Sequence, residues 1–326
     1  MKILITGCAG FIGFSLSRKL LDKTSHHIIG IDSLNNEYDS GLKKDRMNIL
    51  TKYKKFTFHK ININNYRLIK ESFLKERYDR VIHLAAQAGV RKSIHDPDLY
   101  LKSNIIGQFN ILKASNLIKL KHLIFASSSS VYGKSNKFPL YENDKTDSPE
   151  SFYAATKKSN EVIAMSFSKI YFLPITALRF FTVYGEYGRP DMAPYKFTKK
   201  IINGETIDLF NSGDHYRDFT YIDDITINII KLINKIPKKS NIKAPFEIFN
   251  IGNGSTIRLS KFVNLIEKKL GKKAKIKKLP MQRGDVYKTY ASNKKLKNII
   301  KLSNTTPIEQ GMQKFIDWFK SYHKIN

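Results

Sequence analysis

The stretch from Lys2 to Gly13, which reads KILITGCAGFIG, decides the fold. Lys2 to Thr6 has the length and composition of a buried strand, and Phe14 to Leu21 has helical periodicity. A glycine-rich turn at such a junction lets the backbone approach a pyrophosphate at the helix N-terminus. The turn offers five residues for this contact: Gly7, Gly10, Phe11, Ile12 and Gly13.

A carboxylate follows the second expected strand, His27 to Ile31. Asp32 lies about twenty residues past the last glycine, where an acid can accept hydrogen bonds from an adenosine ribose. A negative charge there also repels a 2′-phosphate, so NAD is expected rather than NADP. A coincidental glycine turn is the alternative, but the two features together favour a dinucleotide site.

Strands and helices alternate through the next part of the chain. Further strands are expected at Phe56 to His59, Arg80 to Leu84, Lys121 to Ala126 and Leu173 to Arg179. The alternation predicts an α/β fold with a doubly wound parallel (Rossmann) sheet that binds ligands at the carboxyl ends of its strands. We expect an NAD-binding domain at residues 1–180, with a return segment near 223–249. A smaller C-terminal α/β domain for the substrate is expected at 181–326.

The strand ends carry small and polar residues that would face such a ligand. They are Asn62 and Ile63, then Leu84, Ala85, Ala86, Gln87 and Arg91, then the serine run Ser127 to Ser130. A serine run is compatible with ordinary loop chemistry. Its position at a strand end favours a hydroxyl that contacts the substrate.

The composition limits the class of protein. The chain has 326 residues, 41% of them hydrophobic, and a net charge of +29. Its densest lysine run, Lys268 to Lys278, has no interleaved aromatic residues, so a solvated basic surface is favoured over a specific nucleic-acid site. Cys8 is the single cysteine, so neither an intramolecular disulfide nor a cysteine-based metal site is expected, which fits the cytoplasm. No apolar run has the length of a membrane span.

Tyr153 and Lys157 form a possible proton acceptor. Their spacing places a phenol and an ammonium one turn apart on the same face of a helix. A phenolate at neutral pH requires a pKa shift of roughly three units, or about 4 kcal/mol. A cation about 4 Å away supplies roughly that much at an effective dielectric near 20. This spacing is common by chance in a lysine-rich chain, so its meaning depends on the surrounding motifs.

Those motifs resemble the extended short-chain dehydrogenase/reductase superfamily, in its nucleotide-sugar epimerase/dehydratase branch, over nearly the whole chain. The motifs that carry the resemblance are Thr6 to Gly13, His83-Leu84-Ala85-Ala86, Ser127 to Gly133, Tyr153-x-x-x-Lys157 and Arg179 to Gly185. The resemblance implies an NAD-dependent enzyme. It also implies a homodimer formed by helix pairing.

The resemblance also implies roles for individual residues. Tyr153 corresponds to the proton acceptor, and Lys157 to the lysine that binds the nicotinamide ribose and lowers the tyrosine pKa. Ser128 corresponds to the hydroxyl that bonds the sugar oxygen. Asn104 matches an asparagine that is structural or relays protons, and a satisfied buried amide is an equal alternative.

The reaction can be narrowed within the branch. Dehydratases carry an acid pair before Val-Tyr-Gly because elimination of water requires an added acid and base, and decarboxylases usually keep the glutamate. Here those positions are Ser129 and Ser130. Epimerisation remains, since it needs one acid/base and reversible hydride transfer.

The sugar is indicated by two segments, His83 to Arg91 and Gly188 to Ala193, which are similar to the UDP-glucuronate 4-epimerase pattern. That likeness implies that Thr182 and Arg189 recognise the uronate carboxylate. An ordinary loop arginine, or one that binds the diphosphate, is the alternative for Arg189. The substrate residues implied together are Gln87, Arg91, Ser130, Thr182, Arg189, Arg217 for the diphosphate, Gln282, and Asp285 for the uridine ribose.

Four positions depart from the family pattern on the cofactor or substrate side. They are Asn62, where aspartate is usual, and Glu186, Pro194 and Arg283. These departures put the exact sugar in doubt, and two alternatives to a UDP-glucuronate 4-epimerase stay open. One is a 4-epimerase for UDP-glucose or UDP-N-acetylglucosamine, and the other is a non-enzymatic NAD-sensing or nucleic-acid-binding protein.

Overall fold

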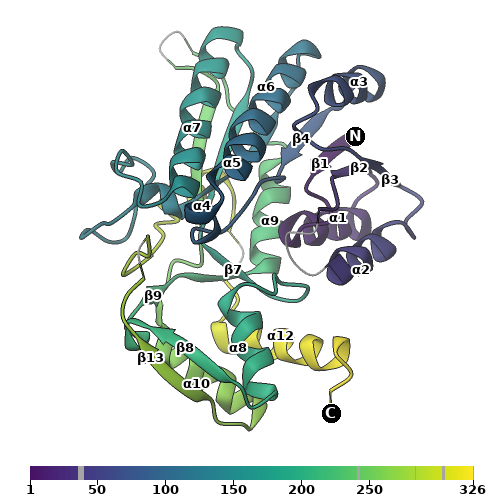
Figure 1. Cartoon of the computed structure of the whole chain (residues 1–326). Coiled ribbons are helices and arrows are strands. Elements are labelled where there is room, and N and C mark those ends of the chain that lie inside the picture. Colours follow the sequence, from purple (N-terminus) through teal and green to yellow (C-terminus); the bar gives the residue numbers. More distant parts are fainter. Residues whose placement is uncertain (36–39, 241–242, 283, 303–304, 326) are drawn as a thin grey trace.

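A seven-stranded parallel sheet forms the centre of the upper part of the molecule (Figure 1). The computed structural model describes residues 1–35, 40–240, 243–282, 284–302 and 305–325. The strands run in the order β11-β6-β5-β4-β1-β2-β3, which confirms the doubly wound sheet. Their bounds are β1 Lys2–Thr6, β2 His27–Asp32, β3 Phe56–Lys60, β4 Arg80–His83, β5 Leu123–Ser128, β6 Ile175–Phe180 and β11 Phe246–Ile251.

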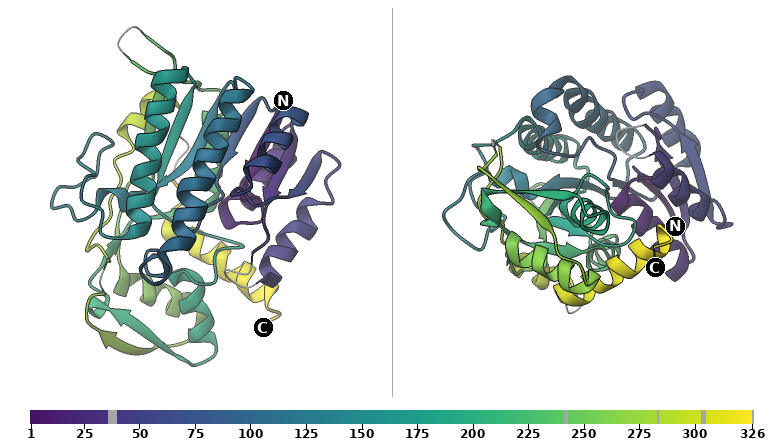
Figure 2. Two further views of the ribbon diagram at one scale, coloured as in Figure 1. Left: turned by 45° about the horizontal axis from the view of Figure 1, so that its top comes forward. Right: turned by 60° about the horizontal axis from the view of Figure 1, so that its bottom comes forward.

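Helices cover both faces of this sheet (Figure 2). On one face lie α1 Phe11–Lys23, α2 Ser40–Leu50, α9 Ile222–Leu232 and α11 Lys294–Ile299. On the other lie α3 Tyr66–Glu76, α6 Gly107–Leu117 and α7 Phe152–Tyr171. The short elements α4 Lys92–His95, α5 Pro97–Tyr100 and a π-helix at Leu101–Ile106 precede α6.

The strands read as near-continuous apolar runs because both sheet faces are covered. In β1, Ile3 and Ile5 pack into the core beneath α1, whereas Leu4 packs into the core beneath α3 and α6. All three side chains have no exposed surface. The alternation follows from the two-residue repeat of a strand.

Among the described residues, the lower part of the molecule contains three two-stranded ladders and three α-helices, and it lies below the large sheet in Figure 1. The ladders pair β7 Thr182–Tyr184 with β10 Phe219–Tyr221, β8 Thr206–Phe210 with β13 Lys275–Leu279, and β9 Tyr216–Arg217 with β12 Ile257–Arg258. The helices are α8 Ala193–Ile202, α10 Leu259–Leu270 and α12 Ile308–Tyr322. Their apolar faces share one core, which contains Phe262, Phe315 and Phe319.

The chain crosses between the two parts more than once. After β10 it returns to the large sheet, where α9 packs beside α1 and β11 pairs with β6. The segment from Phe246 is therefore an edge strand of the large sheet. The division at residue 180 stays a prediction. Within the described residues, no helix is both long enough and apolar enough to span a membrane.

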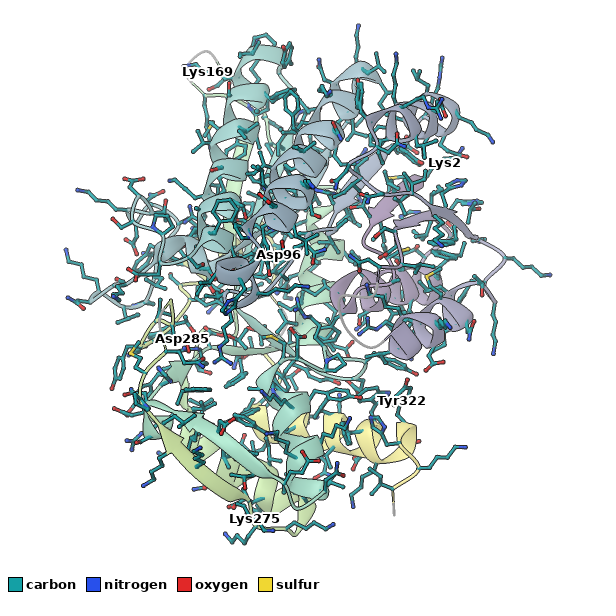
Figure 3. All side chains as sticks on the ribbon, viewed as in Figure 1. Lys2, Asp96, Lys169, Lys275, Asp285 and Tyr322 are labelled. Carbon is teal, nitrogen blue, oxygen red and sulfur yellow. The ribbon has the colours of Figure 1, made fainter. Side chains whose placement is uncertain are left out.

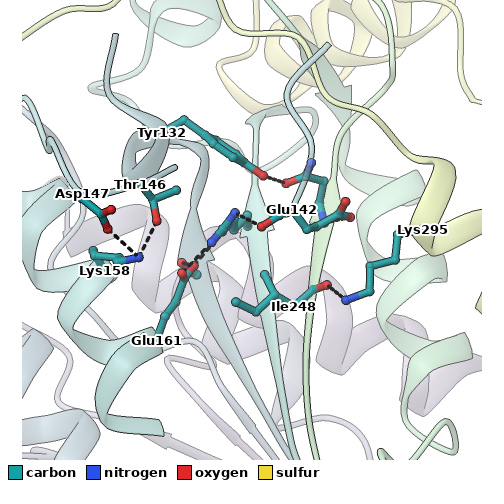
Figure 4. Close-up of polar contacts among 11 residues, drawn as sticks. Tyr132, Glu142, Thr146, Asp147, Lys158, Glu161, Ile248 and Lys295 are labelled. Carbon is teal, nitrogen blue, oxygen red and sulfur yellow. Dashed lines mark hydrogen bonds and ion pairs between the residues drawn. The ribbon is translucent and has the colours of Figure 1, made fainter. Parts of the chain in front are cut away.

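A buried ion pair connects α7 to the sheet (Figure 4). The Arg179 guanidinium on β6 donates to both carboxylate oxygens of Glu161 on α7, each at 2.8 Å. The two side chains are only 3% and 4% exposed. The Ser127 hydroxyl at the end of β5 donates to the same Glu161 carboxylate at 2.5 Å. Glu161 therefore binds α7 to two neighbouring strands.

The same cluster extends to the edge strand. The Arg179 guanidinium lies 4.7 Å above the Tyr132 ring, and the Tyr132 hydroxyl donates to Asn250 Oδ1 at 2.6 Å. The Asn250 backbone N–H donates to the Glu142 carboxylate at 2.9 Å. Polar groups buried this deeply require such partners, because an unpaired one costs about 1–3 kcal/mol.

Breaking the buried pair from one side should destabilise the fold. Glu161→Leu or Arg179→Leu alone should lower the free energy of unfolding by about 3–5 kcal/mol, because each leaves an uncompensated buried charge. In the double variant, the free energy of unfolding should fall by less than the sum of the two single losses. Urea unfolding provides the measurement, with Glu71→Leu as control, since Glu71 pairs with Arg67 on the exposed face of α3. Additive losses would contradict this account of the pair.

Candidate active site

The glycine-rich turn between β1 and α1 is packed too closely for larger residues. A Cβ on Gly7, whose φ is +73°, would lie 2.8 Å from the Ala85 nitrogen. A Cβ on Gly13 would lie 2.1 Å from the Gly7 oxygen. Among the described residues, no side chain caps the N-terminus of α1, which begins after Gly10. Its first N–H groups therefore suit an anionic diphosphate, and the turn fits the dinucleotide expected there.

Asp32 helps to shape this turn. One oxygen of its carboxylate accepts from the Ala9 N–H at 3.1 Å and the other from the Leu34 N–H at 2.8 Å. Its expected hydrogen bond to a ribose would use the remaining lone pairs, and that role stays a prediction. The carboxylate thus lies beside the phosphate-binding backbone.

Asn62 and Ile63, which are expected to face the cofactor, have other contacts in the structure. Asn62 Oδ1 accepts from the Asn64 N–H at 3.0 Å, as in an Asx-turn. The Ile63 side chain is 7% exposed and packs against Gly107, where a Cβ would lie 2.5 Å from Ile63 Cδ1. Their contacts with a cofactor stay predictions.

The residues after β4 lie against the glycine turn. The Leu84 N–H donates to the Thr6 carbonyl at 3.2 Å, and the Ala85 N–H donates to the Thr6 hydroxyl at 3.2 Å. The close approach of Gly7 to Ala85 results from this pairing. Ala86 follows directly in the same loop.

Asn104 holds the next part of this loop. In the π-helix it accepts from the Gln87 N–H at 2.8 Å, and its amide donates to the Gln87 carbonyl and the Thr156 hydroxyl, both at 3.0 Å. These contacts satisfy the buried amide, and the family role of Asn104 stays a prediction. Asn104 links the substrate-side loop to α7, the helix of Tyr153.

The first turns of helix α7 carry Tyr153 and Lys157. The Ser151 hydroxyl caps it by accepting from the Ala154 N–H at 3.1 Å. The Lys157 ammonium donates to the Ala126 carbonyl of β5 at 2.8 Å and lies 6.0 Å from the centre of the Tyr153 ring. The Ser128 hydroxyl, at the end of β5, is 3.1 Å from both the Ser130 N–H and the Ser130 hydroxyl.

The electrostatics of this group differ from the sequence-based expectation in one respect. Burial raises the pKa of Tyr153, while its hydrogen bond with Ser128 and the charge of Arg189 oppose that shift. The charge of Arg189 is thus one influence that favours the phenolate, and the role expected of Lys157 stays a prediction. Burial lowers the pKa of Lys157 to about 8.

Arg189 reaches the site from the loop after β7. Its Nε and Nη2 donate to the two carboxylate oxygens of Asp191 at 3.0 and 2.6 Å, and Nη2 also donates to the Ala88 carbonyl at 3.1 Å. Thr182, at the start of β7, donates its backbone N–H to the Asp218 carbonyl at 3.1 Å. The sequence offered no signal for the pairing with Asp191.

Two departures from the family pattern lie in the same loop region. The Glu186 carboxylate accepts from the Tyr221 hydroxyl at 2.7 and 2.8 Å, and this contact, with burial as the larger cause, raises the pKa of Tyr221. Pro194 occupies the first turn of α8, where a missing N–H has no cost. Arg283 lies outside the described residues.

Three distant segments bring charges together where the two parts of the molecule meet. Asp285 lies 3.6 Å from Arg91 and 3.8 Å from Arg217, and Figure 3 places it between those parts. The Asp285 N–H also donates to the Gln282 carbonyl at 3.3 Å. Two guanidinium groups at one point suit a diphosphate.

Arg46 is a residue that the sequence reading missed. It is fully buried, and it donates to the carbonyl oxygens of Ala9 at 2.8 Å and Tyr187 at 2.6 Å. It therefore connects the glycine turn to the Arg189 loop. Its spacing from Leu42 and Leu50, on one stripe of α2, is the signal that could have found it.

Comparison with known proteins gives consistent results. The model of the NAD dependent epimerase/dehydratase family matches residues 3–252. Protein CapI of Staphylococcus aureus is 48% identical over 99% of this chain and 100% of its own length. A probable UDP-glucuronate 4-epimerase of Rhizobium meliloti (strain 1021) is 39% identical over 99% of this chain and 98% of its own.

A solved structure is similar over the same length. The UDP-glucuronic acid 4-epimerase from Bacillus cereus, in complex with UDP-glucuronic acid and NAD, has a TM-score of 0.91. It is 33% identical, and the match covers 99% of this chain and 100% of that one. The fold of that protein and the NAD in its structure agree with a dinucleotide site at the glycine-rich turn of this chain.

Asp32 should make the chain prefer NAD over NADP. Two like charges about 5 Å apart repel by roughly 3 kcal/mol at an effective dielectric near 20, so NADP should bind about a hundredfold more weakly. Asp32→Asn should remove most of this difference, and Asp22→Asn, on the exposed side of α1, should not. Calorimetry on cofactor-free protein measures both affinities. Equal affinities in the unaltered protein would contradict the assignment.

Proposed function

We propose that this chain, which belongs to the NAD dependent epimerase/dehydratase family, catalyses the 4-epimerisation of a UDP-sugar. The proposed reaction is the conversion of UDP-glucuronate to UDP-galacturonate through a 4-keto intermediate. The observation that supports it best is the group formed by Ser128, Tyr153 and Lys157 beside the glycine turn, with the Arg189 guanidinium close enough to favour the Tyr153 phenolate.

The acid/base step belongs to Tyr153. As phenolate it takes the proton from the sugar 4-hydroxyl, while Ser128 bonds the same oxygen and keeps it near the ring. NAD bound at the glycine-rich turn would supply reversible hydride transfer at C4. Tyr153 then gives the proton back, so one residue serves both directions. Lys157, fixed by the Ala126 carbonyl, is placed to hold the cofactor ribose.

The UDP end of the substrate must stay bound while the 4-keto sugar rotates about its diphosphate linkage. Arg91 and Arg217 can hold the diphosphate, and Asp285 can meet the uridine ribose, with Gln87, Ser130 and Gln282 lining the path between the ends. A 4-keto uronate is a β-keto acid that loses carbon dioxide readily. Arg189 and Thr182, by holding its carboxylate, would suppress that loss.

Two alternatives compete with this assignment. A 4-epimerase for UDP-glucose or UDP-N-acetylglucosamine would share Ser128, Tyr153 and Lys157 and differ only around Arg189. A non-enzymatic NAD-sensing or nucleic-acid-binding protein would explain the net charge of +29. It would not require a serine at the end of β5 together with a tyrosine and a lysine on α7.

We also propose a cytoplasmic homodimer that binds no specific nucleic acid. Helices α6 and α7 lie side by side, with the Phe109 and Phe167 rings 5.8 Å apart. Both carry large apolar side chains that are 40% to 61% exposed: Phe109, Leu117, Val162, Met165 and Ile170. Such a surface suits the same helix pair of a second copy.

The pH dependence should reveal the charge that activates Tyr153. Because the Arg189 charge lowers the pKa of Tyr153, Arg189→Leu should raise that pKa and move the acidic limb of the kcat profile to higher pH. Arg189→Lys keeps the charge and should leave the limb near its original position. Tyr153→Phe should bind NAD and lose most activity at every pH. If the acidic limb of Arg189→Leu stays at its original pH, Arg189 does not lower the pKa of Tyr153.

The sugar is tested by turnover of UDP-glucuronate, UDP-glucose and UDP-N-acetylglucosamine at equal low concentration. A hydrogen bond to a charged group contributes roughly 1.5–3 kcal/mol, which predicts a ten- to hundredfold preference for the uronate. Arg189→Leu should erase the preference and release more 4-keto-pentose. Arg189→Lys should recover only part of it, because lysine lacks the planar fork. Faster turnover of either neutral sugar would favour the alternative.

The dimer is tested by a charge on the exposed helix face. Val162→Glu should convert the protein to monomers, because an unpaired carboxylate at an apolar interface loses its hydration. Ile299→Glu, at an exposed apolar position on α11, is the matched control and should leave the assembly unchanged. Light scattering after gel filtration gives the mass. A monomer before any substitution would refute the proposal.

A further inference from the structure

The turn that leads into α8 holds a carboxylate next to Arg189. The Met192 N–H donates to the Arg189 carbonyl at 3.2 Å, with Pro190 and Asp191 at the two central positions. Proline fixes the backbone at the first of these positions, so the turn is rigid. Asp191 is therefore held near the guanidinium by local geometry, at little cost in conformational entropy.

The Arg189–Asp191 contact has the geometry by which arginine recognises a carboxylate. Both oxygens of Asp191 meet the Nε–Nη2 edge, and Nη2 also donates to the Ala88 carbonyl. A substrate carboxylate can form the same two-pronged contact on that edge only after Asp191 leaves it. The Arg189 side chain is 21% exposed and that of Asp191 is 47% exposed. Asp191 is therefore the partner whose side chain can rotate away into the solvent.

This pair lies close to the reacting groups. The Ala88 carbonyl that binds Arg189 is 3.3 Å from the Tyr100 hydroxyl, which also donates to the Gly89 carbonyl at 2.8 Å. The Tyr100 ring meets the Tyr153 ring edge-on, with centres 6.2 Å apart. The Arg189–Asp191 pair is therefore connected to the Tyr153 ring through the Ala88 carbonyl and Tyr100.

We propose that Asp191 is a specificity-determining residue that occupies the Arg189 fork until the substrate carboxylate replaces it. The inference rests on the proposed function, because it assumes a uronate. A uronate must displace Asp191, and this cost weakens its binding. A neutral UDP-sugar does not displace Asp191 from Arg189, so its affinity does not depend on this ion pair. Asp191 thus limits the preference for uronates and favours release of the product.

A purely positioning role for Asp191 makes the opposite prediction. If Asp191 only orients the guanidinium, its removal would leave Arg189 less ordered. The uronate would then bind more weakly. The sign of the change in affinity therefore separates competition from positioning.

The experiment measures binding without turnover, on NAD-loaded protein carrying Tyr153→Phe. Calorimetry with UDP-glucuronate, UDP-glucose and UDP compares this parent with Asp191→Asn and Asp191→Ala in the same background. Asp317→Asn, an exposed acid on α12, controls for the loss of one negative charge. An unchanged affinity for UDP shows that each variant is folded.

Asp191→Asn and Asp191→Ala should each bind UDP-glucuronate about three- to fivefold more tightly, the effect expected of a partly exposed ion pair. Their affinities for UDP-glucose and UDP should not change. Asp317→Asn should leave the affinities for all three ligands unchanged. Weaker uronate binding, or equal tightening for all three ligands, would overturn the proposal. A parent that does not prefer the uronate to UDP-glucose would instead overturn the proposed substrate, which this comparison shows separately.

Discussion

The buried pair between Glu161 and Arg179 is the constraint on which the active site depends. It fixes α7, which carries Tyr153 and Lys157, against the ends of β5 and β6. Through Ser127 it also holds the strand end that carries Ser128. A one-turn shift of α7 along its axis would move the phenol by about 5 Å. The pair therefore sets the distance between Tyr153 and Ser128, the proposed proton acceptor and its neighbouring hydroxyl.

Burial opposes both charged forms in the site, since it raises the pKa of Tyr153 and lowers that of Lys157. Placed cations and hydrogen bonds must offset this cost. The arginines assigned to the substrate already have protein carboxylates as partners, Asp191 for Arg189 and Asp285 for Arg91 and Arg217. None of these three guanidinium groups therefore lacks a carboxylate partner, and in the proposed enzyme the substrate carboxylate would replace Asp191 on Arg189.

Much of the fold could be predicted from local sequence patterns. The turn at Gly7 and Gly13 and the apolar strands were predictable because their signals lie within a few neighbouring residues. Contacts between distant segments were not predictable. Arg46 joins two loops that are far apart in sequence, and the 4 Å approach assumed for Lys157 and Tyr153 ignored the Ala126 carbonyl that holds the ammonium. The place of Asp191 on the Arg189 fork depends on a turn geometry that one sequence does not show.

The central claim is that one hydride leaves C4 and returns to it, while Tyr153 carries the only exchanged proton. The most direct test follows UDP-glucuronate labelled with deuterium at C4 during turnover in ordinary water, by mass spectrometry and NMR. The account predicts that UDP-galacturonate keeps the full label at C4. It also predicts no incorporation at C4 or C5 when unlabelled substrate reacts in heavy water. Loss of the C4 label to solvent, or solvent deuterium at C5, would contradict it.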